Sequence, residues 1–556
     1  MVDSDRDDSN HQTTQARRTQ MRSVRAATMI YPMVPCRATC LNLDILQTTI
    51  DFVEERSDVL TLSLVSSTVR SMALRRLLNM VPIQLKDELS IRRFHDFLSV
   101  DAATRGSHVR ALDIWTSNVQ EEPNCKELET LLCEILSRTR NLHTLSLPSY
   151  VSPLPGAQSD LRVALEGLST LRELRIDGYD DKAPHTLVEK IRSPIRTLRT
   201  GFISLDDDDY CTPSRISAYL SHLIPTLRLL ELGTVDFSEE LTDTDSFTIT
   251  PCTFVHSLNI ITIDGTPDLA ILLRWFPALE GSLVLGPLEI YDWSSIDYER
   301  ARERNIRSQR DGSWKGIDEL ICDANTLYVL GLVCPLRRVV VDHCVASSKH
   351  HIVSALSDNP PAQLYLSVEI SQGLDILEKL VPQQAKETLT HLTLCLYYIG
   401  GKTWRSNVRF NAILQLRSGV LWKVLSASIR HLRLTHLRVV FHCDIRGPIG
   451  TSAAGSPVDS KALIKSIRDT DIQAAAAALS HGNPSLQYVF VTNSGYIDES
   501  VHDAHEQWLQ DGGWRTLGGR YGEMGMEELD SESAKLIIVR EEMDLTAKDK
   551  RRVLYQ

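Results

Sequence analysis

The sequence predicts an α/β repeat protein, in which parallel strands line the concave side of a solenoid and a small helical unit precedes the repeats. Three observations predict this class. A short strand-like pattern recurs from Val109 onward, helix-like stretches separate many of its copies, and three short amphipathic helices fill residues 41–78. Strands that alternate with helices form parallel sheets through right-handed crossovers, and stacked copies curve into an arc.

The recurring pattern is an apolar or Leu-Arg opening followed by alternating apolar residues. Its copies begin at Val109, Leu142, Leu171, Ile195, Leu227 and Val255, spaced by about 24–33 residues. The pattern L-x-x-L-x-L at a spacing of about 20–29 residues is typical of leucine-rich repeats, so these copies are long and irregular members of that class. Looser copies begin at Leu336, Leu364, Leu389, Ile429 and Leu486, and Leu536–Val539 is predicted to be a closing strand.

The alternation within each strand also predicts which residues face outward from the core. Residues i and i+2 of a strand share one face, so Leu145 and Leu147 point into the core and the residue between them points away. The same reasoning places a set of polar residues on the concave sheet face, namely Asp113, Ser146, Arg175, Glu231 and Asn259. This mixed polar surface suits a protein target better than nucleic acid, and a solvated face without a partner is the alternative.

The helical unit at 41–78 carries apolar residues at helical spacing in three runs. Ser57-Asp58 and Ser66–Thr68 break the runs, and each break offers side-chain oxygens that can cap the next helix. Fewer than forty residues cannot bury a self-sufficient core, so the unit is expected to dock on other parts of the chain or on a partner.

The order of residues in this unit resembles the F-box. The matching residues are Leu41, Leu43–Leu46, Asp58–Leu60, Leu64-Val65 and Val69-Arg70. Asn42 stands where the family often has Pro, Ser66 where it has Cys, and Val69 where it has Trp. With the repeats that follow, the chain resembles the F-box/leucine-rich-repeat proteins, especially the divergent ones of mushroom-forming fungi.

The resemblance implies a substrate-receptor subunit of an SCF-type ubiquitin ligase, which performs no bond chemistry itself. The F-box-like helices would bind a Skp-family adaptor held by a cullin scaffold, and the repeat arc would bind an unknown protein target. The expected adaptor-binding residues are Leu41, Leu43, Ile45, Leu46, Val59, Leu60 and Val65. The alternative is a leucine-rich-repeat interaction scaffold without a ubiquitin-ligase role, in which the N-terminal helices cap the solenoid.

Composition restricts the possible partners and the compartment. The net charge of −12 and the sequence pI near 5.8 argue against nucleic acid as a partner, because phosphate binding needs a basic face. No apolar stretch approaches the roughly 18–20 residues of a membrane span, and the first residues lack a basic signal-peptide start. The eleven scattered Cys are expected to be reduced thiols of a cytoplasmic or nuclear protein.

Motifs for catalysis, cofactors and metals are missing from the sequence. It contains no G-x-x-x-x-G-K-[ST], G-x-G-x-x-G or G-x-S-x-G motif, so neither an enzyme nor a cofactor is predicted. Cys36 and Cys40 have no second pair at finger spacing, and His391 and Cys395 merely share a strand face. No metal site is therefore predicted.

The expected divisions of the chain are a disordered leader at 1–35, the helical unit at 36–82, a helical connector at 83–108, the repeats at 109–540 and a tail at 541–556. Four segments interrupt the repeats and are predicted to be surface loops. They are Asp206–Asp209, Asp292–Gly312, Gly447–Ser460 and residues 511–533.

Overall fold

A computed structural model describes most of the chain. The described residues are 42–115, 125–150, 160–178, 183–201, 212–237, 249–289, 297–400, 420–446, 465, 467–499, 504–517 and 525–554. Contacts divide the chain into two compact units, Met1–Ala73 and Leu74–Gln556. Two of the predicted loops, Asp206–Asp209 and Gly447–Ser460, and the leader at 1–35 lie outside the described residues.

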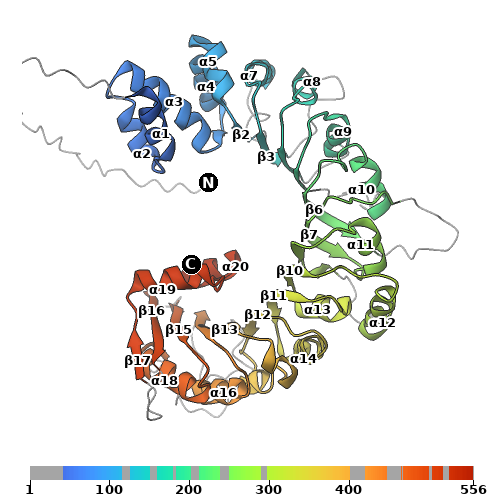
Figure 1. Ribbon diagram of the computed structural model, residues 1–556, viewed down its shortest axis with the longest axis vertical. Helices are drawn as coiled ribbons and strands as arrows, with labels where there is room; N and C mark the ends of the chain where they lie inside the picture. The colour runs from blue at the N-terminus through green and yellow to red at the C-terminus, as the bar shows by residue number, and fades with distance from the viewer. Residues whose placement is uncertain are drawn as a thin grey trace, which may run out of the picture. The chain divides into compact units, whose positions relative to one another are not determined.

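The first unit contains the three short helices that the sequence predicts (Figure 1). They are α1 (Leu43–Phe52), α2 (Arg56–Leu62) and α3 (Ser67–Met80), the last of which continues into the second unit. Asn42 caps α1, because its side chain accepts a hydrogen bond from the backbone N–H of Asp44 at 2.9 Å. The Ser66 hydroxyl accepts one from the N–H of Val69 at 3.2 Å, as the break before α3 predicts.

The second unit is built on one continuous sheet, and the described residues contribute seventeen strands to it. The strands are β1 (Ile83–Leu85), β2 (Ala111–Ile114), β3 (Thr144–Tyr150), β4 (Glu173–Gly178), β5 (Thr197–Thr200), β6 (Leu229–Asp236), β7 (Ser257–Asp264), β8 (Ser282–Leu285), β9 (Leu288–Glu289), β10 (Ile317–Cys322), β11 (Leu336–Cys344), β12 (Gln363–Glu369), β13 (His391–Gly400), β14 (His436–Arg446), β15 (Tyr488–Glu499), β16 (Ala504–Leu517) and β17 (Gly525–Glu528).

Almost all of these strands pair in parallel and in chain order. The ladder runs from β1 to β8, continues from β8 to β10, and then runs from β10 to β15, while β9 pairs with β7. The last two strands are antiparallel: β16 returns along β15, and β17 returns along β16. The prediction of an α/β repeat with mainly parallel strands is confirmed.

Helices connect most of the strands and lie on the outer side of the curved sheet (Figure 1). They are α4 (Glu88–Val100), α5 (Ala102–His108), α7 (Cys125–Arg138), α8 (Asp160–Glu166), α9 (Ala183–Lys190), α10 (Pro213–Leu220), α11 (Leu269–Trp275), α12 (Tyr298–Ser308), α13 (Ala324–Leu330), η1 (Ala346–Ser348), α14 (Lys349–Asp358), η2 (Leu374–Leu377), η3 (Gln383–Glu387), α16 (Val420–Ile429) and α18 (Ile472–Gly482). Two further helices, α19 (Ser531–Arg540) and α20 (Ala547–Leu554), lie on the inner side.

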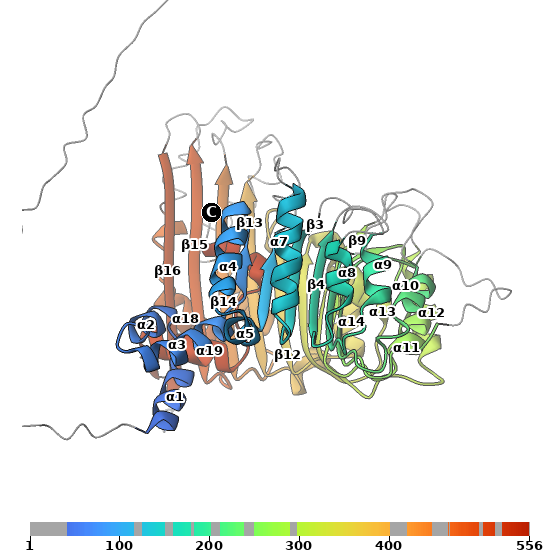
Figure 2. The same cartoon turned by 90° about the horizontal axis from the view of Figure 1, so that it is seen from above.

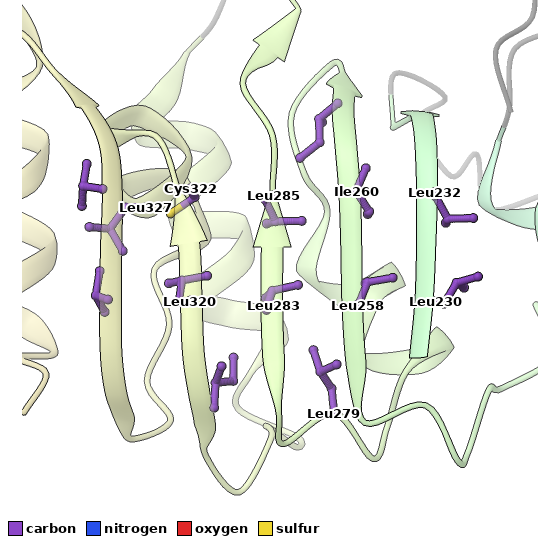
Figure 3. Packing of buried hydrophobic residues seen from close by; sticks show 14 of the residues in the cluster. Leu230, Leu232, Leu258, Ile260, Leu279, Leu283, Leu285, Leu320, Cys322 and Leu327 are labelled. Atoms are coloured by element: carbon purple, nitrogen blue, oxygen red, sulfur yellow. The ribbon is translucent and has the colours of Figure 1, made fainter. Parts of the chain in front are cut away.

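The core lies between the strands and the outer helices, and the Leu pattern forms it. Leu230 and Leu232 on β6 pack in register with Leu258 and Ile260 on β7, and Leu283 continues the row on β8 (Figure 3). A fully buried Leu contributes about 1.5–3 kcal/mol to stability, so a row repeated across many strands accounts for much of the stability of the sheet. The residues between these positions form the opposite face, which we call the inner face.

The described parts of two predicted loop segments are mainly regular structure instead of loops. Residues 511–533 contain the end of β16, all of β17 and the start of α19. The charged segment Asp292–Gly312 contains α12, which joins the outer helical layer through the buried Asn305. The Asn305 side chain accepts a hydrogen bond from the N–H of Leu269 at 3.0 Å and donates to the carbonyl oxygens of Pro267 and Val329. Because α12 is mostly charged, the sequence pattern did not indicate this buried polar residue.

The C-terminal end of the sheet also differs from the prediction. Leu536–Val539 is not a closing strand but part of α19, which begins where Asp530 accepts hydrogen bonds from the N–H groups of Glu532 and Ser533. Of the strands formed by the looser copies, β11 and β12 pair with a register shift, whereas β13, β14 and β15 are ten to twelve residues long and pair without one (Figure 2). Their length lets them carry both a core on the outer side and packed side chains on the inner side.

Candidate interaction surfaces

The first candidate surface lies on the helices of the first unit. Among the predicted adaptor-binding residues, Leu43, Ile45, Leu60 and Val65 are exposed, Leu46 is half-buried and Val59 is fully buried. Leu41 lies outside the described residues. Phe52 and Leu64, which the sequence reading did not select, are 80% and 76% exposed. The structure therefore separates residues that pack the unit, such as Val59 and Ile50, from apolar residues that face solvent.

The second candidate surface is a polar row on the inner face of the early strands. The register places Asp113 beside Ser146, Ser146 beside Arg175, and Glu231 beside Asn259 on neighbouring strands. Their chain neighbours Leu112, Leu145, Leu174, Leu230 and Leu258 are buried in the core. The strand register therefore places these polar residues on the face opposite the core. Their role in binding remains a prediction.

Arg199 completes this row, and the sequence reading missed it. Arg199 pairs in register with Arg175 on one side and with Glu231 on the other, and its Nε lies 4.0 Å from a carboxylate oxygen of Glu231. In the copy that begins at Ile195, Arg199 directly follows Leu198 and continues the alternation. We call the six residues the polar row: Asp113, Ser146, Arg175, Arg199, Glu231 and Asn259.

The same row of the sheet becomes apolar and then buried toward the C-terminus. After Asn259 it continues through Val284, Ile321, Val340 and Tyr365 on the next four strands of the ladder. Val284 and Ile321 are half-buried, whereas Val340 and Tyr365 are 1% and 2% exposed. The residues from Ser531 to Leu554, which include α19 and α20 and which we call the C-terminal segment, cause this burial. Leu545 and Val553 of this segment pack with Val340, Tyr365, Cys395, Tyr397 and Val440.

A buried carboxylate anchors α20 to the inner face. Asp549 is fully buried and accepts hydrogen bonds from the hydroxyl groups of Tyr365 and Tyr397, which lie on β12 and β13. Burial, more than the neighbouring charge, raises the pKa of both tyrosines far above their ordinary value, so both phenols keep their protons and donate. The guanidinium group of Arg552 lies over the Tyr397 ring, 4.9 Å from its centre. One of its nitrogens is 3.9 Å from a carboxylate oxygen of Asp549, so its positive charge compensates part of the buried negative charge.

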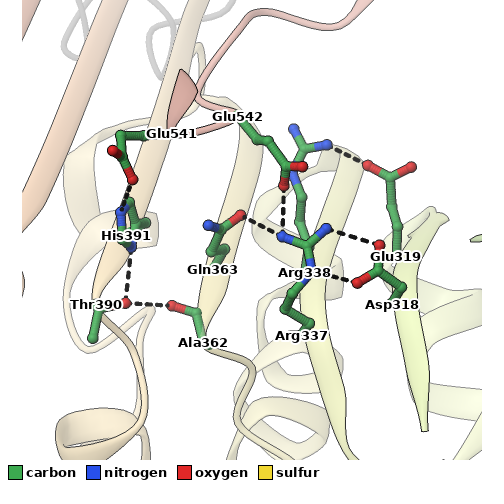
Figure 4. Close-up of polar contacts among 10 residues, drawn as sticks. All are labelled: Asp318, Glu319, Arg337, Arg338, Ala362, Gln363, Thr390, His391, Glu541 and Glu542. Carbon is green, nitrogen blue, oxygen red and sulfur yellow. Dashed lines mark hydrogen bonds and ion pairs between the residues drawn. The ribbon is translucent and has the colours of Figure 1, made fainter. Parts of the chain in front are cut away.

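The end of α19 is tied to the sheet by ion pairs (Figure 4). Arg337 on β11 makes two bonds to the Asp318 carboxylate, at 2.5 and 2.9 Å, and one to Glu542 at 2.5 Å. The neighbouring Arg338 pairs with Glu319. Further along, Arg438 donates to the carbonyl oxygen of Met543 at 2.7 Å, and Met543 packs on Phe490. The C-terminal segment therefore belongs to the folded repeat unit and is not a separate tail.

The described cysteines and helices provide no further candidate surface. Seven described cysteines are free, and six of them are buried. Burial raises the pKa of Cys252 and Cys344 to about 12, which makes these thiols poor nucleophiles. Among the helices that the structure describes, none is both long and apolar enough to cross a bilayer.

One group of described residues could hold a metal ion, although the sequence predicted no such site. His391, His436 and Glu541 bring one ligand atom each to within 4.8 Å of one another. A signal was present in the sequence, because the tetrapeptide L-T-H-L occurs both at 389–392 and at 434–437, in two strand copies.

Comparisons with known proteins give limited information. No family model matches the chain, and no curated protein matches it in sequence. Among solved structures, the crystal structure of the leucine-rich repeat-containing protein LegL7 from Legionella pneumophila is similar at 14% identity and a TM-score of 0.32. The match covers 72% of this chain and 98% of that chain. The repeat architecture is therefore assigned from the strand order, the register and the helical layer of the chain itself.

Proposed function

We propose that this protein is a non-catalytic receptor that holds two protein partners, one on the helices of the first unit and one on the inner face of the early repeats. In the specific form that the F-box resemblance suggests, the first partner is a Skp-family adaptor bound to a cullin scaffold. The second partner is then a target for ubiquitin transfer. Tethering the target raises the local concentration of its lysines near the loaded enzyme, and the receptor needs no chemistry of its own.

The exposed apolar side chains of the first unit carry this proposal. Ile45, on α1, and Leu60, on α2, are 56% and 48% exposed although each belongs to a helix with a buried apolar residue. Burying one such side chain in an interface contributes about 1.5–3 kcal/mol. A contiguous patch of exposed apolar residues marks a protein-interaction site, and the proposal requires that these side chains form one.

The alternative is a repeat scaffold in which these helices only cap the solenoid. A cap hides its apolar side chains against the adjacent repeat, because the end of a solenoid is itself apolar. Adaptor binding distinguishes the two functions, because only the receptor needs it. The polar row serves the same purpose in both cases, since each function needs a surface that binds a protein.

Capture of a purified Skp-family adaptor by the full chain tests the proposal. The wild-type chain should bind the adaptor, and the double variant Ile45→Asp, Leu60→Asp should lose binding because both charges would be buried in the interface. Val163→Asp is the matched control, since Val163 is equally exposed on a helix, α8, of the repeat unit.

Two outcomes would contradict the adaptor assignment. One is a wild-type chain that does not capture the adaptor, and the other is a double variant that captures it normally. If the wild-type chain captures protein targets through the polar row but no adaptor, the scaffold function is the correct one. Circular dichroism of each variant checks that the helices remain folded.

A further inference from the structure

Two histidines occupy the same position in two neighbouring repeats. His391 on β13 and His436 on β14 are direct register partners, and each follows a threonine in the sequence L-T-H-L. Their rings stack with centres 4.3 Å apart and an angle of 7° between the planes. Both rings lie on the inner face, where Tyr488 stacks on the other side of His436.

The preceding threonines determine which ring nitrogen carries the proton. The Thr390 hydroxyl donates to the carbonyl oxygen of Ala362 at 3.2 Å, and its oxygen lies 2.8 Å from Nδ1 of His391. The Thr435 hydroxyl donates to the carbonyl oxygen of Thr390 at 3.1 Å, and its oxygen lies 2.9 Å from Nδ1 of His436. A hydroxyl has one proton, so each oxygen must accept from Nδ1–H. Each neutral ring then has its lone pair on Nε2.

A carboxylate from the C-terminal segment meets these lone pairs. Oε2 of Glu541 lies 3.3 Å from Nε2 of His391, while its other oxygen accepts a hydrogen bond from Arg540 at 2.8 Å. Nε2 of His436 is buried and has no hydrogen-bond partner among the described residues, and the whole residue is 7% exposed. In this tautomer Nε2 of His391, Nε2 of His436 and the Glu541 carboxylate are three acceptors that face one another.

We propose that His391, His436 and Glu541 bind a Zn²⁺ ion through Nε2 of each ring and Oε2 of the carboxylate, with a water in the fourth position. Two imidazoles and one carboxylate form a common zinc ligand set, with Zn–N distances of about 2.0–2.1 Å. In a tetrahedral zinc site the ligand atoms are about 3.3 Å apart. The three ligand atoms now lie within 4.8 Å of one another, so side-chain rotation would bring them to that spacing.

The bonds from the threonines match the arrangement that zinc sites use. A zinc-bound histidine usually donates its other ring N–H to an oxygen, which fixes the ring and its tautomer. Here Thr390 and Thr435 provide that oxygen. The ion would tie the end of α19 to two strands of the sheet, and this inference does not depend on the proposed receptor function.

Zinc titration of the purified full chain tests the site. After removal of metal with a chelator, the wild-type chain should bind one equivalent of Zn²⁺ by calorimetry. His436→Gln should abolish binding. Thr435→Val leaves all three ligands in place and should weaken binding by about 10–100-fold, as loss of an outer-shell partner does. His481→Gln is the control, because His481 is exposed on α18 and lies outside the cluster, and it should bind as the wild type does.

Replacement of Zn²⁺ by Co²⁺ identifies the ligands independently of stability. The absorption spectrum should show a tetrahedral site without thiolate-to-metal charge transfer, because no Cys is a ligand. The proposal is overturned if the wild-type chain binds no zinc, if Thr435→Val and His481→Gln bind zinc equally well, or if the cobalt spectrum shows thiolate ligation. In the first case Nε2 of His391 carries a proton and donates to Glu541.

Discussion

The inner face is polar on the early strands but largely apolar and covered on the late strands, although both halves share one strand pattern. From β2 to β7 the polar row presents Asp113 to Asn259 toward solvent. From β11 to β14 the inner positions are apolar, aromatic or hydrogen-bonded, and α19 and α20 cover them. The core positions are mostly Leu, Ile or Val in both halves, and the late strands add Cys344, Tyr398 and Phe441. Core-facing residues thus specify the architecture, whereas inner-facing residues specify what lies on it.

This difference restricts where a large partner can bind. A protein target can reach the polar row without displacing any described segment of the repeat unit. On the late strands it would first have to remove the C-terminal segment, which Asp549, Arg337 and Arg438 hold in place. The early half is therefore the better candidate surface, and the predictions below compare the two halves directly.

Placing a charge under the C-terminal segment should have the largest effect. Val340 and Val284 occupy the same row, but Val340 is covered by α20 and Val284 is half-buried. We expect Val340→Asp to lower the free energy of unfolding by at least about 3 kcal/mol, because a buried unpaired charge is costly. Val284→Asp should lower it by about 1 kcal/mol or less. Urea unfolding measures both, and equal losses would contradict the comparison.

Removing the carboxylate that anchors α20 should have the next largest effect. Asp549→Ala leaves the hydroxyls of Tyr365 and Tyr397 buried without an acceptor, and each unsatisfied donor costs about 1–3 kcal/mol. We expect a loss of about 2–4 kcal/mol in unfolding free energy. Glu231→Ala in the polar row is the control, and it should change the value by less than about 0.5 kcal/mol. A loss for Asp549→Ala as small as the control's would show that α20 is not held this way.

Acid should weaken the ion pair between Asp318 on β10 and Arg337 on β11. The bonds from Arg337 lower the pKa of Asp318 below its ordinary value of about 3.9. A carboxylate with a lowered pKa stabilises the fold above that ordinary value, and the stabilisation is lost as pH falls through the folded-state pKa. The melting temperature of Asp318→Asn should therefore be lower than the wild-type value at pH 7, and the gap should narrow as pH falls below the ordinary pKa of an Asp. A gap that stays constant with pH would contradict this assignment.

Charge reversal in the polar row should have the smallest effect on stability. The triple variant Asp113→Lys, Arg175→Glu, Glu231→Lys changes residues that are exposed or half-buried, so unfolding free energy should shift by no more than about 1 kcal/mol. Capture of a protein target should weaken, while adaptor capture stays unchanged. Normal target capture by this variant, together with a loss on changing the outer helices, would move the binding surface to the helical side.

The periodic features of the fold could be predicted from the sequence, whereas contacts between residues far apart in the sequence could not. The alternation in L-x-x-L-x-L determines the core and the polar row, because each strand repeats the same two-residue period. No periodicity connects Asp549 with Tyr365, or Glu541 with His391, so the docking of the C-terminal segment could not be read from pattern. Leu536–Val539 shows a smaller failure, since a short apolar run fits a strand or a helix equally well. The N-cap Asp530 was the signal that favoured a helix.

Thiol labelling of Cys395 tests the central claim, that the C-terminal segment covers the late inner face. Cys395 lies on the inner face under Leu545 and Val553, and burial raises its pKa to about 12. A maleimide should not react with Cys395 in the native full chain, as mass spectrometry can show. The double variant Leu545→Asp, Val553→Asp should label Cys395 rapidly, while Cys252 in the outer core stays protected in both proteins. Equal labelling of Cys395 in the wild-type chain and in the variant would contradict the account.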